Sequence, residues 1–271
     1  MSCGTPPINI NHSGPRSTAM SDNVPVNALE TSLTIVETLK EQEHATLTEL
    51  AQEVDLPKST VFNHAKTLER NEYLVNEGGS YRVGCRFLEL GAKARDYHDV
   101  YEIARQEVDR LAAETGEISA LIIEEHGYGV FLHREEGTQA VHIDSYVGQR
   151  IYLHGAALGK AILASLPRER VDGIVDQHGL PALTPNTITD REELYEELDR
   201  IEERGVALDD QERLNGLRGV AVPLTDADGN VLGSMSIAGP TSRVQDERFR
   251  EEFPAKIKDA ADVIELNVTY S

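Results

Sequence analysis

A row of short polar and basic side chains lies between residues 58 and 70. In helical geometry Val61, Ala65 and Leu68 share one side of this segment and leave the polar side chains on the other. An apolar back with a hydrogen-bonding front is what a helix lying in a DNA major groove requires. The front can reach phosphate oxygens or base edges through Lys58, Ser59, Thr60, Asn63, Lys66, Thr67 and Arg70.

A second, shorter helix must hold this segment in place. Thr46 is followed three residues later by Glu49, the spacing of a capping box, which satisfies free N–H groups at a helix start. Pro57 suits the first turn of the next helix because it has no N–H to leave unsatisfied. Residues 46–70 therefore predict a helix-turn-helix. An ordinary helical hairpin with a solvated polar face is the alternative.

The flanking segments favour the DNA-binding interpretation. Residues 28–40 carry apolar side chains at helical spacing and predict a preceding helix. Residues 73–75 and 81–83 flank Gly78–Gly79, which predicts a β-hairpin. Three helices and a hairpin make a winged helix-turn-helix, in which Arg82 of the wing can touch the DNA backbone.

The charge of the chain is unusual for a DNA-binding protein. The formal net charge is −21, with 47 Asp and Glu against 26 Lys and Arg, whereas phosphate contacts normally require a basic surface. A surface rich in Asp and Glu resembles that of proteins from a salt-saturated cytoplasm, where charge repulsion is screened. A halophilic source is our hypothesis for this composition.

The length of 271 residues suits two domains. We expect a disordered tail at residues 1–24, a winged helix-turn-helix domain at 25–84, a linker helix at 85–98 and a larger domain at 99–271. No apolar run is long enough to span a bilayer and no signal segment begins the chain, so we expect a cytoplasmic protein without membrane contact. Cys3 and Cys85 lie far apart and form no metal-ligand spacing.

The larger domain has helical patterns at both ends and strand patterns between them. Apolar runs predict strands near residues 118–124, 128–133, 141–146, 206–208, 217–224 and 231–238. Thr189 and Glu192 repeat the capping-box spacing and predict the start of a long charged helix. This arrangement indicates an α+β fold with an antiparallel sheet and flanking helices, and not a parallel nucleotide-binding sheet.

Motifs for catalysis and cofactors are missing from the sequence. There is no P-loop and no GxGxxG after a strand, and Gly233–Ser234–Met235–Ser236 lacks the second glycine of a nucleophile elbow. The histidines have no HExxH spacing, and Asp226–Asp228 lacks the later Glu of a calcium loop. We therefore expect no catalytic residue, no metal and no cofactor. A hydrolase whose Ser–His–acid set is hidden by the spacing, and a ligand-binding or interaction module that does not bind DNA, stay open as alternatives.

With both halves considered together, the chain resembles the IclR family of transcription regulators from residue 26 to its end. In the first half the resemblance depends on LTELAQEVDLPKSTVFNHAKTLERNEYL and the closing YRVG. In the second half it depends on HGAALGKAILASLP, LPALTPNTITDREEL, GVALDDQE and GVAVPLTDADGNVLGSMSIAGPTSR. These segments follow one another in the family's order and spacing.

The resemblance implies a GAF-like effector domain that binds a small organic acid. It also implies a homodimer or a dimer of dimers acting on an inverted-repeat operator in double-stranded DNA. The positions that match the family's effector contacts are Gly155, Ala156, Asp209, Leu217, Ser234 and Ser236.

The residues themselves agree with parts of this implication. Gly155–Ala156 lies at a predicted helix start, where free N–H groups and the helix dipole favour an anion. Ser234 and Ser236 are two apart on a predicted strand and point to one face. The alternatives are close helix packing for the Gly-Ala pair and a half-exposed polar strand for the serines. For Asp209 the alternatives are a solvated acidic loop, or Asp210 or Glu212 in the same role.

Two positions depart from the family pattern. Gly219 stands where members often have Cys, which removes a side chain from the expected pocket. Asn63 stands where recognition helices commonly have Arg; Asn can pair with adenine through two hydrogen bonds, so the operator sequence is expected to differ.

Overall fold

The computed structural model of the chain describes residues 24–143 and 145–270. The described residues divide into two compact units, one ending at Tyr97 and one beginning at His98. Most of the tail expected at residues 1–24 lies outside the described residues. No helix within the described ranges is long and apolar enough to cross a membrane.

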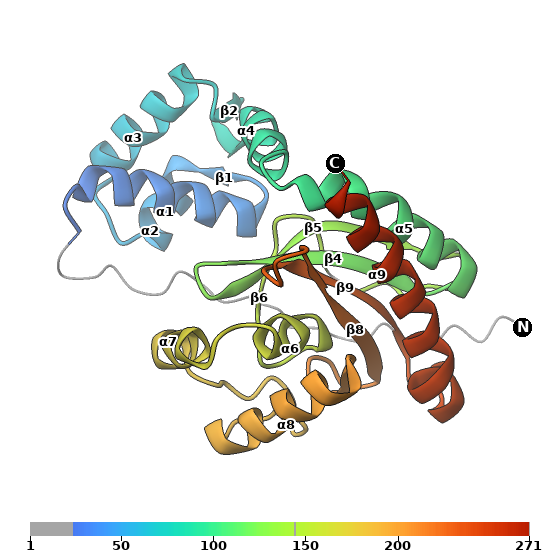
Figure 1. Ribbon diagram of the computed structural model, residues 1–271. Coiled ribbons are helices and arrows are strands. Elements are labelled where there is room, and N and C mark those ends of the chain that lie inside the picture. The colour runs from blue at the N-terminus through green and yellow to red at the C-terminus, as the bar shows by residue number, and fades with distance from the viewer. Residues whose placement is uncertain (1–23, 144, 271) are drawn as a thin grey trace, which may run out of the picture. The chain divides into compact units, whose positions relative to one another are not determined.

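The N-terminal unit is a three-helix bundle with a small sheet, followed by a fourth helix (Figure 1). The sheet is antiparallel, with strand order β1-β3-β2. The short strand β1, which pairs Ala45 with Tyr81, was not predicted. In chain order the elements are α1 (Asn27–Gln42), β1 (Ala45–Thr46), α2 (Leu47–Glu53), α3 (Lys58–Arg70), β2 (Leu74–Glu77), β3 (Ser80–Val83) and α4 (Arg86–Arg95).

Local sequence signals account for the boundaries in this unit. Helix α2 begins with the predicted capping box: the Thr46 N–H donates to Glu49 Oε2 at 2.7 Å, and the Glu49 N–H donates to Thr46 Oγ1 at 3.4 Å. Pro57 is the cap residue immediately before α3. Gly78 and Gly79 form the two-residue loop between β2 and β3 with φ of 65° and 98°, the left-handed region that such tight hairpins need.

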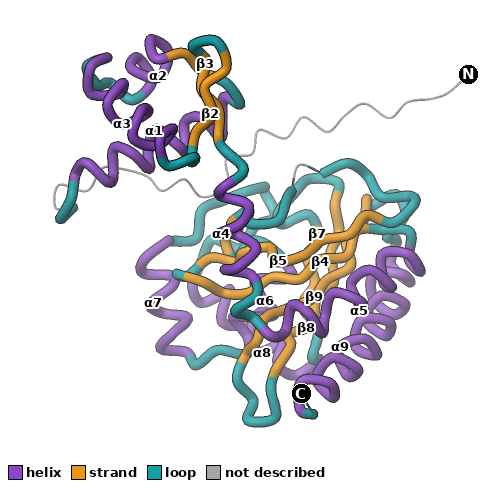
Figure 2. The backbone as a smooth tube through the Cα atoms, turned by 90° about the horizontal axis from the view of Figure 1, so that it is seen from above, coloured by secondary structure: helices purple, strands orange, loops and turns teal. Residues whose placement is uncertain are grey.

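The C-terminal unit is one six-stranded antiparallel sheet with helices on both faces (Figures 1 and 2). The strand order is β6-β5-β4-β9-β8-β7. The elements are α5 (Asp99–Thr115), β4 (Ile118–Glu125), β5 (Tyr128–Glu136), β6 (Arg150–Tyr152), α6 (Ala157–Ala164), α7 (Arg168–His178), α8 (Arg191–Arg204), β7 (Ala207–Asp210), β8 (Leu217–Thr225), β9 (Val231–Pro240), the π-helical turn η1 (Arg248–Glu252) and α9 (Phe253–Thr269).

Each face of this sheet has its own apolar core, because successive side chains of a strand point to opposite faces. Helices α5 and α9 cover one face, where Leu121 and Met235 are buried against them. Helix α6 covers the other face over Ala120 and Ile122, with α7 and α8 outside it. The predicted α+β fold with an antiparallel sheet is confirmed.

Two expected details were wrong. The described residues of 141–146 form no strand. Ile143 instead packs against Ile118 and Leu217, and the strand that pairs with β5 at residues 128–130 is β6, further along the chain. Helix α8 is capped by Asp190, whose Oδ1 accepts from the N–H groups of Glu192 and Glu193 at 2.9 and 3.0 Å. Asp190 directly precedes the helix, so it takes the role expected of Thr189.

Candidate functional site

The exposed front of α3 carries all seven polar residues expected on it. Val61 and Ala65 are fully buried against the rest of the N-terminal unit. Lys58, Ser59, Asn63, Lys66, Thr67 and Arg70 are exposed, and Thr60 is half-buried. The arrangement gives α3 an apolar back and a hydrogen-bonding front.

An aromatic side chain that the sequence reasoning missed shares this helix. Phe62 is 44% exposed although it is large and apolar. It falls between the apolar positions Val61 and Ala65 and therefore escapes a search for periodic core residues. An exposed apolar side chain on such a helix can contact the methyl group of thymine.

Three cations of the α3 front and the wing have partners inside the unit: Lys58, Lys66 and Arg82. Lys66 forms an ion pair with Glu69 at 2.7 Å, and Arg82 forms one with Glu77 at 2.7 Å. The ammonium group of Lys58 donates to Thr48 Oγ1 at 2.7 Å and so joins α3 to α2. Exposed pairs of this kind are weak, so a phosphate group can replace the acidic partner.

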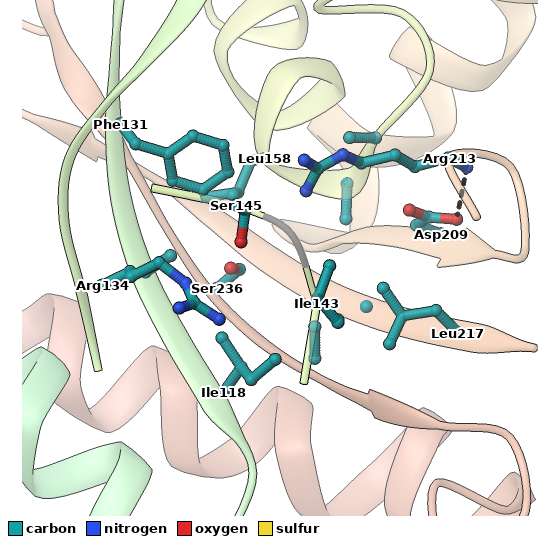
Figure 3. A pocket seen from close by; sticks show the side chains of 15 residues that line it. Ile118, Phe131, Arg134, Ile143, Ser145, Leu158, Asp209, Arg213, Leu217 and Ser236 are labelled. Atoms are coloured by element: carbon teal, nitrogen blue, oxygen red, sulfur yellow. Dashed lines mark hydrogen bonds between the residues drawn. The ribbon is translucent and has the colours of Figure 1, made fainter. Parts of the chain in front are cut away.

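The C-terminal unit contains a cavity between α6 and the sheet, open on one side (Figure 3). Four of the six predicted effector residues line it: Ala156, Asp209, Leu217 and Ser236. Gly219 also lines it, and a Cβ at that position would lie 3.7 Å from the Cβ atoms of Asp209 and Ala238, an ordinary contact.

The other two predicted residues lie beside the cavity. The Ser234 hydroxyl is fully buried and donates to the carbonyl oxygen of Leu158 at 2.8 Å. Gly155 precedes the cap of α6, and a Cβ there would come within 2.5 Å of Leu183 Cδ1. Ser234 therefore holds the first turn of α6 against β9, and Gly155 allows Leu183 to pack closely.

Helix α6 presents its first turn to the cavity through Ala156, Ala157 and Leu158. The first N–H groups of a helix have no acceptor within it, and they add to the positive end of the helix dipole. This end of the cavity can bind an anion.

Arg134 is a cavity residue that the sequence reasoning missed. The ladder between β4 and β5 shifts register: Ile122 pairs with Phe131, but Leu121 pairs with His133. Leu132 is the extra residue of a β-bulge, which re-aims the side chains that follow. Phe131 and Arg134 therefore both line the cavity, although residues three apart on a regular strand point to opposite faces.

Asp209 is the acidic residue that the structure places in the cavity. Its side chain is buried, and its Oδ1 accepts from the backbone N–H groups of Glu212 and Arg213 at 2.7 and 3.4 Å. Burial, and next the charge of Glu212, raise the pKa of Asp209 to about 7, while Lys160 opposes the shift. Near neutral pH the other carboxyl oxygen, Oδ2, can donate or accept a hydrogen bond.

The two acidic neighbours that competed with Asp209 have other partners. Asp210 pairs with Arg218 at 2.8 Å, which lowers the pKa of Asp210. Glu212 pairs with the buried Lys160 at 2.6 Å. Neither lines the cavity, so the structure separates three residues that the sequence left equivalent.

Arg213 brings a second guanidinium group to the cavity from the segment after β7. Burial lowers the pKa of Arg213 to about 10; the charge of Asp209 opposes this shift and the charge of Arg134 adds to it. The guanidinium carbon lies 5.3 Å from the ring centroid of Phe131. The cavity thus combines apolar walls with concentrated positive charge.

A different cluster of ionisable side chains lies on the other face of the sheet. His133 Nε2 is 2.6 Å from Asp109 Oδ1, and Glu135 lies near enough for the three ligand atoms to be within 4.8 Å of one another. The Asp109 side chain is half exposed. An ordinary His–Asp contact explains this geometry, and we assign no metal to it.

Comparison with known proteins agrees with this two-part organisation. Residues 28–78 match the family described as IclR helix-turn-helix domain, and residues 92–266 match that described as Bacterial transcriptional regulator IclR C-terminal. The second match alone covers more than half of the chain.

Individual relatives match over most of the sequence. A probable HTH-type transcriptional regulator ArcR from Halobacterium salinarum is 30% identical, covering 90% of this chain and 92% of the relative. The HTH-type transcriptional regulator KdgR from Escherichia coli is 33% identical, covering 87% and 90%. The crystal structure of the Thermotoga maritima IclR superimposes with a TM-score of 0.76 at 28% identity, covering 90% of this chain and 99% of that one.

Proposed function

This chain belongs to the IclR family of transcriptional regulators, and we propose that it binds an operator in DNA with an affinity set by a small organic-acid effector. It combines a helix-turn-helix domain with an effector-binding domain. The observation that carries the proposal is the cavity beside the N-terminus of α6, which gathers two guanidinium groups, two hydroxyl groups and the Asp209 carboxyl group on an otherwise apolar wall.

DNA docking is assigned to α3 and the wing. We propose that Ser59, Thr60, Asn63, Thr67 and Arg70 face base edges or phosphates, with Lys58, Lys66 and Arg82 on the backbone. This assignment is supported by the exposed front of α3, which carries the cations Lys58, Lys66 and Arg70. The operator is proposed to be an inverted repeat.

Binding to the gene's own upstream DNA at molar KCl tests the DNA-binding part. Lys66→Glu is expected to abolish the gel shift, because it puts a like charge against the phosphates. Lys256→Glu, the same change on α9 in the other unit, is the matched control and should shift DNA normally. A wild-type protein that shifts no upstream fragment contradicts the assignment.

The effector is proposed to place a carboxylate at the first turn of α6, near Ala156, Asp209 and Leu217. Ser236 contributes a hydroxyl, and Gly155 and Ser234 position the turn. A thermal-shift screen of small carboxylic acids tests this part. A ligand at a hundred times its dissociation constant adds about 2.7 kcal/mol to the free energy of unfolding, and a screen in which no acid moves the transition contradicts it.

The oligomeric state is proposed to be a homodimer or a dimer of dimers. Leu29 and Leu33 of α1 and Leu88 of α4 are largely exposed in the single chain, which leaves apolar surface for another copy to cover. Light scattering after size exclusion at molar KCl gives the mass directly. The same proposal includes a cytoplasmic location and the absence of enzymatic activity. It also includes the domain divisions at residues 25–84, 85–98 and 99–271.

A further inference from the structure

Arg134 is a largely buried cation with an incomplete set of hydrogen-bond partners among the described residues. Its Nη1 donates to Glu136 Oε1 at 2.8 Å, but its Nε and Nη2 are buried without a hydrogen-bond partner among the described residues. Only 13% of the side chain is exposed. Charged donors left unsatisfied in a protein interior are costly, and a native protein that keeps one usually uses it for a ligand or for bound water.

Arg213 approaches the same space from the opposite wall, as Figure 3 shows. Within the described ranges no carboxylate forms an ion pair with its guanidinium group, which lies over the ring of Phe131. The two guanidinium groups repel each other across the cavity, and Asp209, the carboxyl group among the described lining residues, is partly protonated at neutral pH. Among the described residues that line it, the cavity therefore has two guanidinium groups and one carboxyl group.

We propose that the effector is a dicarboxylate, held at one end by Arg134 and at the other by Arg213 and the first turn of α6. This inference depends on the proposed acid-effector function and adds a second acidic group to it. The planar fork of a guanidinium group matches a carboxylate through two parallel hydrogen bonds. The unpaired Nε and Nη2 of Arg134 provide such a fork.

The positions of the hydroxyl groups fit the same orientation. Ser236 and Ser145 lie between the two arginines in the view of Figure 3. They can contact the middle of a chain that joins two carboxylates. A single carboxylate at α6 would leave the fork of Arg134 without an acceptor.

The effect of removing Arg134 on the melting temperature distinguishes a ligand-binding role from a purely structural one. An arginine kept for folding has satisfied partners, so its removal lowers the melting temperature. Arg134→Gln removes a buried charge with two unpaired donors, so the ligand-free variant is expected to melt at the same temperature as wild type or higher. Arg134→Lys keeps the charge without the fork and is expected to lose part of the binding.

The direct test is calorimetric titration of the full chain at molar KCl with pairs of acids of equal length. Each pair replaces one terminal carboxylate by a methyl group: succinate and butyrate, glutarate and valerate, 2-oxoglutarate and 2-oxovalerate. For the best-fitting length, the diacid is expected to bind about 10- to 100-fold more tightly, the range for hydrogen bonds to a charged group. Arg134→Gln should remove this difference.

Arg110→Gln is the matched control, since Arg110 pairs with Glu107 and Glu114 on α5, outside the cavity. It should keep the preference for diacids. Equal binding of diacid and monoacid by wild type, or a preference that survives Arg134→Gln, overturns the dicarboxylate inference and leaves the acid-effector proposal intact. Failure of wild type to bind any acid of either class overturns both.

Discussion

Lys160 and Glu212 form a buried ion pair in which the ammonium nitrogen lies 2.6 Å from both carboxylate oxygens. The Lys160 side chain is 1% exposed and that of Glu212 12%. Glu197 of α8 lies 3.8 Å from the same nitrogen. The pair joins α6, whose first turn lines the cavity, to the segment that carries Asp209 and Arg213.

Removing one partner of this pair should destabilise the C-terminal unit. Lys160→Met leaves Glu212 buried without its counter-charge, and we expect a loss of about 3–5 kcal/mol in the free energy of unfolding. Lys160→Met combined with Glu212→Leu should recover most of this loss, because both buried charges are then gone. Urea unfolding at molar KCl measures both variants.

The exposed pair of Lys66 and Glu69 supplies the control for that experiment. Lys66→Met should leave the unfolding transition essentially in place, since exposed ion pairs contribute little. A Lys160→Met protein as stable as wild type would show that the buried pair does not form.

The titration of Asp209 predicts a pH dependence of stability. Its carboxyl group loses its proton near 3.8 in the unfolded chain and near pH 7 in the folded one. Between these values the folded state binds more protons, so this group's contribution to the free energy of unfolding falls as pH rises from about 4 to about 7, and is constant above.

Asp209→Asn should remove that decline while keeping an oxygen that can accept from the Glu212 N–H. The stability of the variant relative to wild type is expected to grow by up to about 1.4 kcal/mol per pH unit in this window. Glu212, Lys160 and Arg213 face this position in both proteins. Their own contributions to the pH dependence therefore cancel, to first order, in the difference between the two proteins. Melting curves for the pair from pH 4 to pH 9 give the difference, and parallel curves would contradict the assignment of a raised pKa.

The two serines of β9 should separate stability from binding. Ser234→Ala removes a fully buried hydrogen bond to the Leu158 carbonyl, and we expect a loss of about 1–3 kcal/mol in unfolding free energy because that carbonyl is left buried. Ser236→Ala lies in the cavity and should weaken acid binding with little change in melting temperature. Thermal unfolding with and without acid measures both effects. A stability loss in Ser236→Ala and a binding loss in Ser234→Ala would reverse the two roles.

The acidic composition predicts a dependence of stability on salt. With a net charge of −21, repulsion between carboxylates should destabilise the fold in dilute buffer and be screened at high ionic strength. We expect the melting temperature to rise steadily with KCl up to molar concentrations. Full stability in dilute buffer would argue against a halophilic adaptation.

Local signals predicted the elements that depend on neighbouring residues. The capping box of Thr46 and Glu49, and the Gly78–Gly79 loop, are short-range patterns whose physics is complete within a few residues. The same holds for the end of α5 at Gly116, which adopts the left-handed conformation. Such elements could be identified without knowledge of the tertiary fold.

The cavity could be predicted only in part, because its charges depend on long-range register. Arg134 reaches it through a bulge in the ladder between β4 and β5, which an alternation pattern does not reveal. Lys160 lies on a helix of small and apolar residues and pairs with Glu212, 52 positions away. The choice of Asp209 among three neighbouring acids depends on which face of β7 turns to α6.

Effector binding in the C-terminal unit is expected to change the affinity of the full chain for its operator. Fluorescence anisotropy at molar KCl gives the dissociation constant for upstream DNA with and without a saturating acid found by thermal shift. We expect the acid to change this constant by about 5- to 150-fold, the usual range of allosteric coupling, and Arg134→Gln to abolish the change at the same acid concentration. Equal DNA affinity in the presence and absence of a bound acid would show that the effector does not control operator binding.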